Sequence, residues 1–110
     1  MERLELKLYM AQRFSAVLLA GFVTVHLAMI IYAGKAGLDA AAIVSHTKGS
    51  PMWSGFYGSF VLTAGVHGAI GLRNIILETT GFRQNAVNGI AIATGLAICI
   101  LGLQAVRAVT

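Results

Sequence analysis

Three stretches of about 20 mainly apolar residues constrain the fold of this chain more than any other feature. They cover residues 14–33, 53–72 and 87–106, and none of them contains Asp, Glu, Lys or Arg. An apolar helix of about 20 residues is long enough to cross the hydrocarbon core of a bilayer. The backbone groups of such a segment must pair within the helix, because lipid offers them no hydrogen-bond partner. We therefore predict one all-α membrane domain over residues 1–110, with transmembrane helices at about 14–33, 53–76 and 87–107.

The composition supports a lipid bilayer as the main surrounding. Charged residues make up 11% of the chain, whereas a soluble domain has about 25%. The net charge is +4 and the basic residues are scattered singly, so the dense basic patch typical of nucleic-acid binding is missing and we expect no nucleic-acid partner. The first dozen residues are mixed in charge, which argues against a cleaved signal peptide. The single cysteine, Cys99, is expected to be a packing residue.

The connections between the spans carry turn signals. Residues 34–52 contain Gly and Pro, and residues 38–47 within them could form a short helix at the membrane interface. Gly81 is a plausible stop for the second helix. An aromatic belt is expected at one membrane face, and small residues of the third span are expected to serve helix packing. The belt residues are Tyr32, Trp53, Phe56 and Tyr57, and the small residues are Gly89, Ala91, Ala93, Gly95 and Gly102.

The basic residues also suggest an orientation. With three spans, the N-terminal segment and the second loop must lie on the same side of the membrane. That side carries Arg3, Lys7, Arg13, Arg73 and Arg83, and the other carries Lys35, Lys48 and Arg107. Because basic residues are enriched in cytoplasmic loops, we expect a multi-pass protein of the cytoplasmic (inner) membrane with its N-terminus in the cytoplasm.

His26 and His67 lie inside the first and second spans. An ionisable side chain inside the bilayer is costly, and a function is its default explanation. A hydrogen bond to a neighbouring helix would account for one such histidine. Two in so apolar a chain favour ligation of haem iron, for which neutral imidazole is a standard axial ligand. His46 lies in the polar loop and is expected to be solvated.

The surroundings of the two histidines are compatible with a haem. Small side chains near His67 leave room for a flat macrocycle, and two arginines stand at the same membrane surface, where they could pair with haem propionates or simply extend to the interface. Around His67 the helix face holds Phe60, Thr63, Ala64, Gly71 and Asn74, around His26 it holds Ser15, Leu19 and Phe22, and the arginines are Arg13 and Arg73.

The two histidines lie at different depths. At 1.5 Å per residue, His67 is about 9 Å and His26 about 20 Å from the surface that bears Arg13 and Arg73. Two axial nitrogens must flank one iron at about 2 Å each. A difference of about 10 Å in depth therefore predicts two haems, each taking one ligand from this chain and one from a partner.

The segment His67–Glu78, with the sequence HGAIGLRNIILE, closely resembles the second-helix signature of the succinate dehydrogenase cytochrome b subunit. In that signature, Gly follows a His by four residues, Arg follows two residues later, and an acidic residue comes after it. Residues 12–15, with the sequence QRFS, are similar to the His-Arg-x-Ser segment of the same family. The order of the spans and loops is also similar, so the resemblance extends over nearly the whole chain.

The resemblance implies a membrane anchor of respiratory complex II, which carries haem b and helps to form a quinone site. It implies partners that bind at the N-terminal surface, namely an iron–sulfur subunit and a flavoprotein that performs the dicarboxylate chemistry. This chain would then be a non-catalytic electron-transfer subunit. By resemblance, His67 is an axial haem ligand, and Arg13, Ser15, Arg73 and Tyr9 lie near the haem propionates or the quinone.

The sequence also departs from the family pattern. Gln12 replaces the His of the first motif, Asn74 stands where a second His often follows the Arg, and Tyr9 stands where a quinone-contacting Ser can occur. His26 resembles the first-helix ligand of two-haem members, whose single anchor chain has five helices. The three helices predicted here therefore imply half of a bundle, completed by a second small anchor subunit.

Two alternatives remain open from the sequence. The chain could anchor a quinol:fumarate reductase or a related dicarboxylate oxidoreductase, because the anchor does not set the direction of the reaction. It could also be a haem-free structural anchor whose histidines only form hydrogen bonds between helices.

Overall fold

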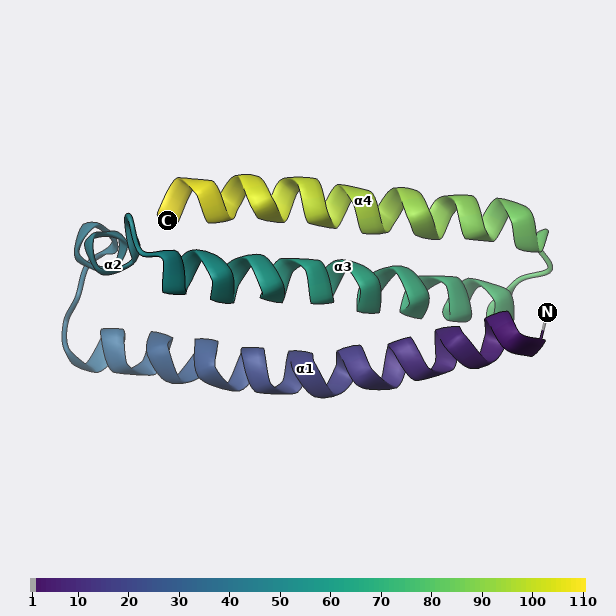
Figure 1. The fold of residues 1–110 in the computed structure, drawn as a ribbon, viewed down its shortest axis with the longest axis horizontal. Helices are drawn as coiled ribbons and strands as arrows, with labels where there is room; N and C mark the ends of the chain where they lie inside the picture. Colours follow the sequence, from purple (N-terminus) through teal and green to yellow (C-terminus); the bar gives the residue numbers. More distant parts are fainter. Residues whose placement is uncertain (1) are drawn as a thin grey trace.

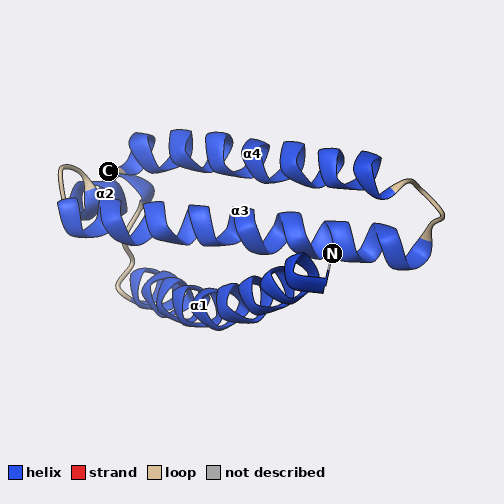
Figure 2. Ribbon diagram, turned by 45° about the vertical axis from the view of Figure 1, so that its right-hand side comes forward, coloured by secondary structure: helices blue, strands red, loops and turns tan. Residues whose placement is uncertain are grey.

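The computed structural model describes residues 2–110, which form four α-helices and no strand (Figure 2). The helices are α1 (Glu2–Lys35), α2 (Ala40–Thr47), α3 (Pro51–Thr79) and α4 (Gln84–Val109). Among the described residues α1, α3 and α4 are long and apolar enough to cross a membrane. The predicted all-α class with three transmembrane helices is therefore confirmed, and the chain is a multi-pass membrane protein. Helix α1 begins much earlier than the predicted span because the polar residues before residue 14 continue the same helix.

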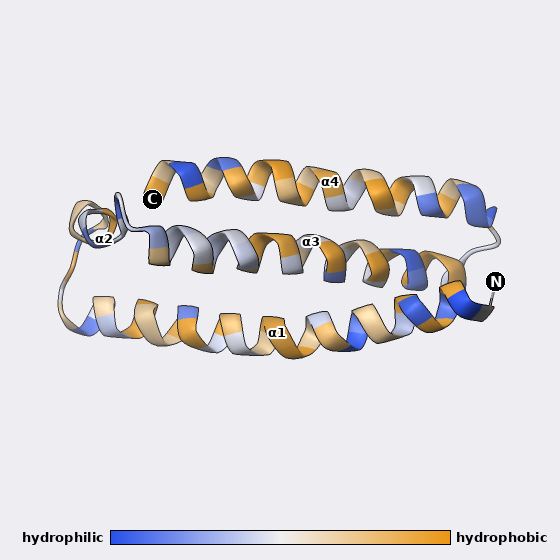
Figure 3. Ribbon diagram, in the orientation of Figure 1, coloured by the Kyte–Doolittle hydropathy of each residue, from blue (hydrophilic) through white to orange (hydrophobic). Residues whose placement is uncertain are grey.

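The three long helices lie side by side, with α3 between α1 and α4 (Figure 1). Both outer helices pack on α3, whereas α1 and α4 have no extensive contact with each other. The N-terminal end of α1 lies at the same end of the molecule as the α3–α4 loop, and the C-terminus lies beside α2 at the other end. Polar residues gather at the N-terminal end and apolar residues fill the middle of the long helices (Figure 3). The layer therefore leaves much of α1 and α4 uncovered by this chain.

Short-range hydrogen bonds set the connection between α1 and α3. Asp39 caps α2 by accepting a hydrogen bond from the amide of Ala42 at 2.8 Å, and Ser50 caps α3 by accepting one from the amide of Trp53. Such caps satisfy amide groups that have no partner within the helix. The turn after α2 also pairs with the end of α4, because the amide of Gly49 donates to the carbonyl of Thr110 at 2.8 Å. The predicted short helix in this loop is thus present and is fastened to α4.

Small residues allow α3 and α4 to approach closely. A Cβ atom added at Gly95 would lie 3.0 Å from Ala69, and one added at Gly102 would collide with Val61. Close approach of backbones increases van der Waals contact, which drives helix association in lipid. Cys99 lies against Gly65 in this interface, in agreement with its predicted packing role. Among the small residues predicted to pack, Ala91, Gly95 and Gly102 do so, whereas Gly89 and Ala93 are exposed.

Arg73 joins all three long helices at the N-terminal end. Its side chain is 6% exposed and donates to the Glu5 carboxylate of α1 at 2.9 Å and to the Asn88 side chain of α4 at 2.8 Å. A third, longer hydrogen bond reaches Asn74 at 3.4 Å. A buried guanidinium requires such partners, because an unpaired buried charge is costly. The predicted interfacial arginine is therefore a buried connection between helices.

The α3–α4 interface predicts a strong effect of adding one methyl group at Gly102. Gly102→Ala places a Cβ against the branched, stiff side chain of Val61 and should destabilise the packed chain by about 1–3 kcal/mol. Thermal unfolding of the purified complex in detergent, followed by helical circular dichroism, measures this loss. Gly89→Ala is the matched control, since nothing lies within 4 Å of its added Cβ. Recovery in the Gly102→Ala/Val61→Ala double variant would confirm the collision, and equal stability of both single variants would contradict it.

The contacts of Arg73 predict that Glu5 stabilises the position of α1. Glu5→Ala leaves the buried guanidinium without its charged partner and should cost about 1–2 kcal/mol, because Glu5 is itself half exposed. The same thermal assay applies. Glu78→Ala is the control, since Glu78 is an exposed acid that makes no ion pair among residues 2–110. A loss of stability in Glu78→Ala as large as that in Glu5→Ala would contradict the assignment.

Candidate functional site

The residues of α1 that face α3 recur at alternating spacings of three and four residues. They are Glu5, Leu8, Gln12, Ser15, Leu19, Phe22 and His26. Such spacing places side chains along one side of a helix. Contacts with α3 follow this stripe in antiparallel order, from Glu5 with Arg73 to His26 with Tyr57. Ser15 and His26, two polar residues of α1 within the membrane region, are therefore directed at α3.

His67 lies against this stripe near the polar end of the molecule. Its Nδ1 atom is 3.3 Å from the hydroxyl oxygen of Ser15, which is 4% exposed. The same hydroxyl donates to the main-chain carbonyl of Gln12 at 3.0 Å. Among the described residues the Nε2 atom of His67 has no hydrogen-bond partner. One ring nitrogen is thus held by α1, and the other is available.

His26 lies in an aromatic cluster nearer the opposite end. Its Nδ1 atom is 3.3 Å from the hydroxyl of Tyr57, and its ring meets the Phe60 ring edge-on at 5.8 Å between centroids. Phe22 stacks on Phe60 at 5.5 Å and meets Phe56 edge-on at 5.4 Å. The aromatic residues predicted as an interfacial belt therefore extend inward and join α1 to α3 around His26.

The contacts of the two histidines place them at separate levels of the layer. His67 is level with Ser15 of α1, and His26 lies eleven residues further along the same helix. At 1.5 Å per residue this separation is about 16 Å along the helix axis. The positions on α3 agree, because Tyr57, which contacts His26, lies ten residues before His67. The separation is larger than the difference in depth estimated from the sequence.

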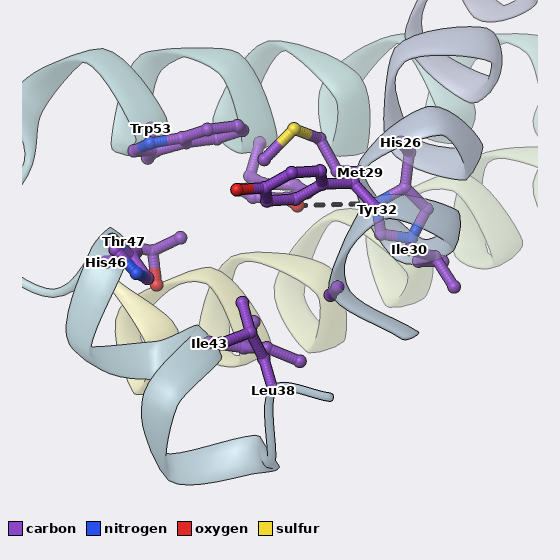
Figure 4. Close-up of a pocket in the computed structure, with 11 residues that line it drawn as sticks. His26, Met29, Ile30, Tyr32, Leu38, Ile43, His46, Thr47 and Trp53 are labelled. Atoms are coloured by element: carbon purple, nitrogen blue, oxygen red, sulfur yellow. Dashed lines mark hydrogen bonds between the residues drawn. The ribbon is translucent and has the colours of Figure 1, made fainter. Parts of the chain in front are cut away.

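A cavity of about 390 Å³ lies beside His26, between the C-terminal half of α1, α2 and the start of α3. His26 and the aromatic rings of Tyr32, Tyr57 and Trp53 contribute to its wall (Figure 4). The dashed line in the figure is the contact between His26 and Tyr57. His46 is exposed, as predicted, but its side chain also lines this cavity from α2. The two histidines enter the cavity wall from different helices.

The arrangement of the histidines is compatible with haem ligation. Histidines that bind metals almost always use one ring nitrogen for the metal and the other for a hydrogen bond. Both His26 and His67 have Nδ1 next to a hydroxyl, and in the described part of the chain neither Nε2 is engaged. No three His, Cys, Asp or Glu side chains that the structure describes, from residue 3 to residue 110, come together as a metal site. Iron binding by this chain would therefore depend on single imidazoles.

The space around His67 differs in one respect from the prediction. A Cβ atom added at Gly71 would lie 3.3 Å from the side-chain nitrogen of Gln12, so Gly71 makes room for α1 and not for a macrocycle. An open groove of about 250 Å³ lies on the other side of Ser15. Thr63 and Leu62 of α3 line this groove together with Phe14 of α1. The groove is shallow, so a large planar ligand would need a second protein wall.

The four residues expected near haem propionates or quinone fall into separate places. Tyr9 and Arg13 line a polar cavity of about 310 Å³ at the N-terminal end, where the Arg13 guanidinium lies 5.8 Å from the centre of the Tyr9 ring. Ser15 contacts His67, and Arg73 is engaged by Glu5. Tyr9 and Arg13 therefore lie together in one cavity, whereas Ser15 and Arg73 make their contacts elsewhere.

Gln12 also lines this polar cavity. From the sequence it was identified only as a departure from the family motif. Its side-chain oxygen Oε1 is buried and has no hydrogen-bond partner among residues 2–110. An orphaned buried acceptor in a native structure calls for an explanation, and a bound donor is one. Glu5 and Asn88 were also missed, and Tyr57 was predicted only as part of the aromatic belt. The alternating three–four spacing that joins Glu5 and Gln12 to Ser15 and His26 could have identified Glu5 and Gln12.

Comparison with known families places the chain in a family of membrane subunits. The family described as succinate dehydrogenase/fumarate reductase transmembrane subunit matches residues 1–105. Comparisons with curated proteins and with solved structures gave no match. The family match covers nearly the whole chain, and it agrees with three membrane-spanning helices and with the resemblance seen in the sequence. The chain therefore belongs to the succinate dehydrogenase/fumarate reductase transmembrane subunit family.

Proposed function

We propose that this chain is the cytochrome b anchor subunit of a succinate:quinone oxidoreductase, with His67 and His26 as axial ligands of two different b haems. The observation that carries the proposal is the pair of intramembrane histidines. Each has Nδ1 beside a hydroxyl of the neighbouring helix, and neither Nε2 is engaged among the described residues. Bound haem iron supplies one-electron transfer, and the chain supplies the ligands and their orientation.

The separation of the histidines supports two haems in place of one. Two nitrogens that bind one metal at about 2 Å each lie at most about 4 Å apart, whereas the levels of His26 and His67 differ by about 16 Å along the helix axis. Each iron would therefore take its second axial ligand from outside this chain. The shallow groove beside Ser15 and the uncovered sides of α1 and α4 are suited to a second small anchor subunit that completes the bundle.

The polar cavity with Tyr9, Gln12 and Arg13 is the proposed quinone site. A quinone carbonyl needs a hydrogen-bond donor, and a quinol hydroxyl needs an acceptor. Arg13 supplies donors, and the Oε1 atom of Gln12 is a buried acceptor whose partner is not found within residues 2–110. The cavity lies at the end of the molecule that carries the N-terminus, where an iron–sulfur subunit bound to a flavoprotein would deliver electrons. We place this end on the cytoplasmic side of the inner membrane.

A haem-free structural anchor is the second candidate function. The observation that favours it is that both histidines already have partners on the neighbouring helix. A hydrogen bond between membrane helices can by itself explain a buried polar side chain. A family member of this kind, or one that operates as a quinol:fumarate reductase, would share the fold.

The haem proposal predicts two b haems for each copy of the chain in the purified complex. His67→Ala should remove one haem equivalent in a reduced-minus-oxidised absorption spectrum, because an axial ligand is lost. His46→Ala is the matched control and should retain both, since His46 is exposed and α2 is not one of the membrane-spanning helices. Absence of b-type absorption bands from the intact wild-type complex would support the structural anchor and contradict the proposal.

The separation of the levels predicts that His26→Ala removes a different haem from His67→Ala. The two variants should lose spectral components with different midpoint potentials, and the double variant should lose both. Redox titration of the alpha band in each variant measures this. If His26→Ala retains every haem equivalent while His67→Ala loses one, the one-haem arrangement is correct and His26 has another role.

A further inference from the structure

The hydroxyl of Ser15 lies between a backbone acceptor and the imidazole of His67. Its oxygen is 3.0 Å from the carbonyl oxygen of Gln12 and 3.3 Å from Nδ1 of His67. The Ser15 side chain is 4% exposed, so solvent does not compete for either contact. The resemblance placed Ser15 near propionates or quinone, and neither assignment accounts for the contact with the ring.

A count of protons gives the direction of both hydrogen bonds. A serine hydroxyl has one proton to donate, and a main-chain carbonyl can only accept. The Ser15 hydroxyl therefore donates its proton to the Gln12 carbonyl. Its oxygen can then only accept a hydrogen bond from Nδ1 of His67. A neutral imidazole carries one N–H. If Nδ1 holds that proton in order to donate to Ser15, Nε2 is left with the lone pair that binds a metal.

From this geometry we propose that Ser15 is a positioning residue that fixes the tautomer and ring orientation of His67 for ligation through Nε2. The inference rests on the proposed role of His67 as a haem ligand and deepens it. Ser15 itself touches no reacting atom. Ser15 orients the His67 ring, and the main-chain carbonyl of Gln12 in α1 in turn orients the Ser15 hydroxyl.

The second histidine provides a comparison within the same chain. The hydroxyl of Tyr57 next to His26 has no other hydrogen-bond partner among the described residues. It can therefore donate to Nδ1 or accept from it, and it leaves both tautomers of His26 possible. The two sites thus differ in one respect, because a hydroxyl with its proton already committed lies only beside His67.

The proposed hydrogen bond has an electronic consequence. An acceptor on the far nitrogen raises the basicity of a ligating imidazole. A more basic axial ligand stabilises the oxidised iron relative to the reduced iron, and second-shell hydrogen bonds are an established means of tuning haem potentials. Loss of the acceptor at Ser15 should therefore raise the midpoint potential of the haem bound by His67.

The test compares Ser15→Ala with Ser15→Thr in the intact complex. Ser15→Ala removes the hydroxyl and should raise the midpoint potential of the His67 haem, by about 59 mV for a tenfold change in the ratio of oxidised to reduced binding. Ser15→Thr keeps a hydroxyl and should keep the wild-type potential. Thr24→Ala is the control on the same helix. In the part of the chain that the structure describes, its exposed hydroxyl bonds only to the carbonyl of Ala20, and its removal should leave the potential unchanged.

The outcomes separate this inference from the proposed function. A shift in Ser15→Ala with a wild-type potential in Ser15→Thr supports it, as does loss of this haem from Ser15→Ala alone. An unchanged potential in Ser15→Ala, or equal effects in both variants, overturns it. If His67→Ala keeps every haem, the proposed ligation itself is wrong. If His67→Ala loses a haem and Ser15→Ala matches the wild type, only the role of Ser15 is wrong.

Discussion

Polar side chains inside a bilayer must be paired by the protein, and the packing of α1 on α3 follows from this requirement. The contacts of Ser15 with His67 and of His26 with Tyr57 lie about 16 Å apart along α1. Together they fix the antiparallel position of one helix on the other, because sliding by one turn would break both. The ion pair of Glu5 with Arg73 extends the same alignment to the membrane surface. The residues proposed for electron transfer are thus also the residues that align the helices.

The α3–α4 interface is held together in a different way. It contains small residues, with Gly95 and Gly102 under Ala69 and Val61, and its stability comes from close backbone approach. Such contacts need no polar side chain within the membrane, and they offer no nitrogen atom that could bind a metal. The chain therefore divides its tasks, because α4 supports α3 by packing while α1 and α3 present the histidines between them.

Much of this fold could be predicted from the sequence, because lipid permits few structures. The three apolar stretches predicted the three transmembrane helices, and the basic residues Arg13 and Arg73 were correctly placed at one end. The continuation of α1 back to Glu2 was missed, since hydropathy detects a span and not a helix that leaves the membrane. His67 and His26 were identified as candidate functional residues only because each lies within an apolar stretch.

Details of the candidate site depended on which faces of the helices meet, and single residues do not reveal this. Arg73 was expected near propionates or quinone, and its contacts with Glu5 and Asn88 were not foreseen. Gly71 was expected to leave space for a macrocycle, but Gln12 fills it. In both cases the sequence shows the residue and its depth in the membrane. It does not show the partner, which lies on another helix and many residues away in the chain.

The length of α1 has a mechanical consequence. Its 34 residues span about 51 Å, whereas the hydrocarbon core is about 30 Å thick. The surplus is continuous helix, with no hinge between the aqueous turns at Glu5 and the level of Ser15. A continuous helix of this kind transmits displacement along its length. A partner that tilts the protruding turns would therefore also shift the Ser15 hydroxyl beside His67. Binding at the membrane surface would in this way alter the hydrogen bond of the proposed ligand within the membrane.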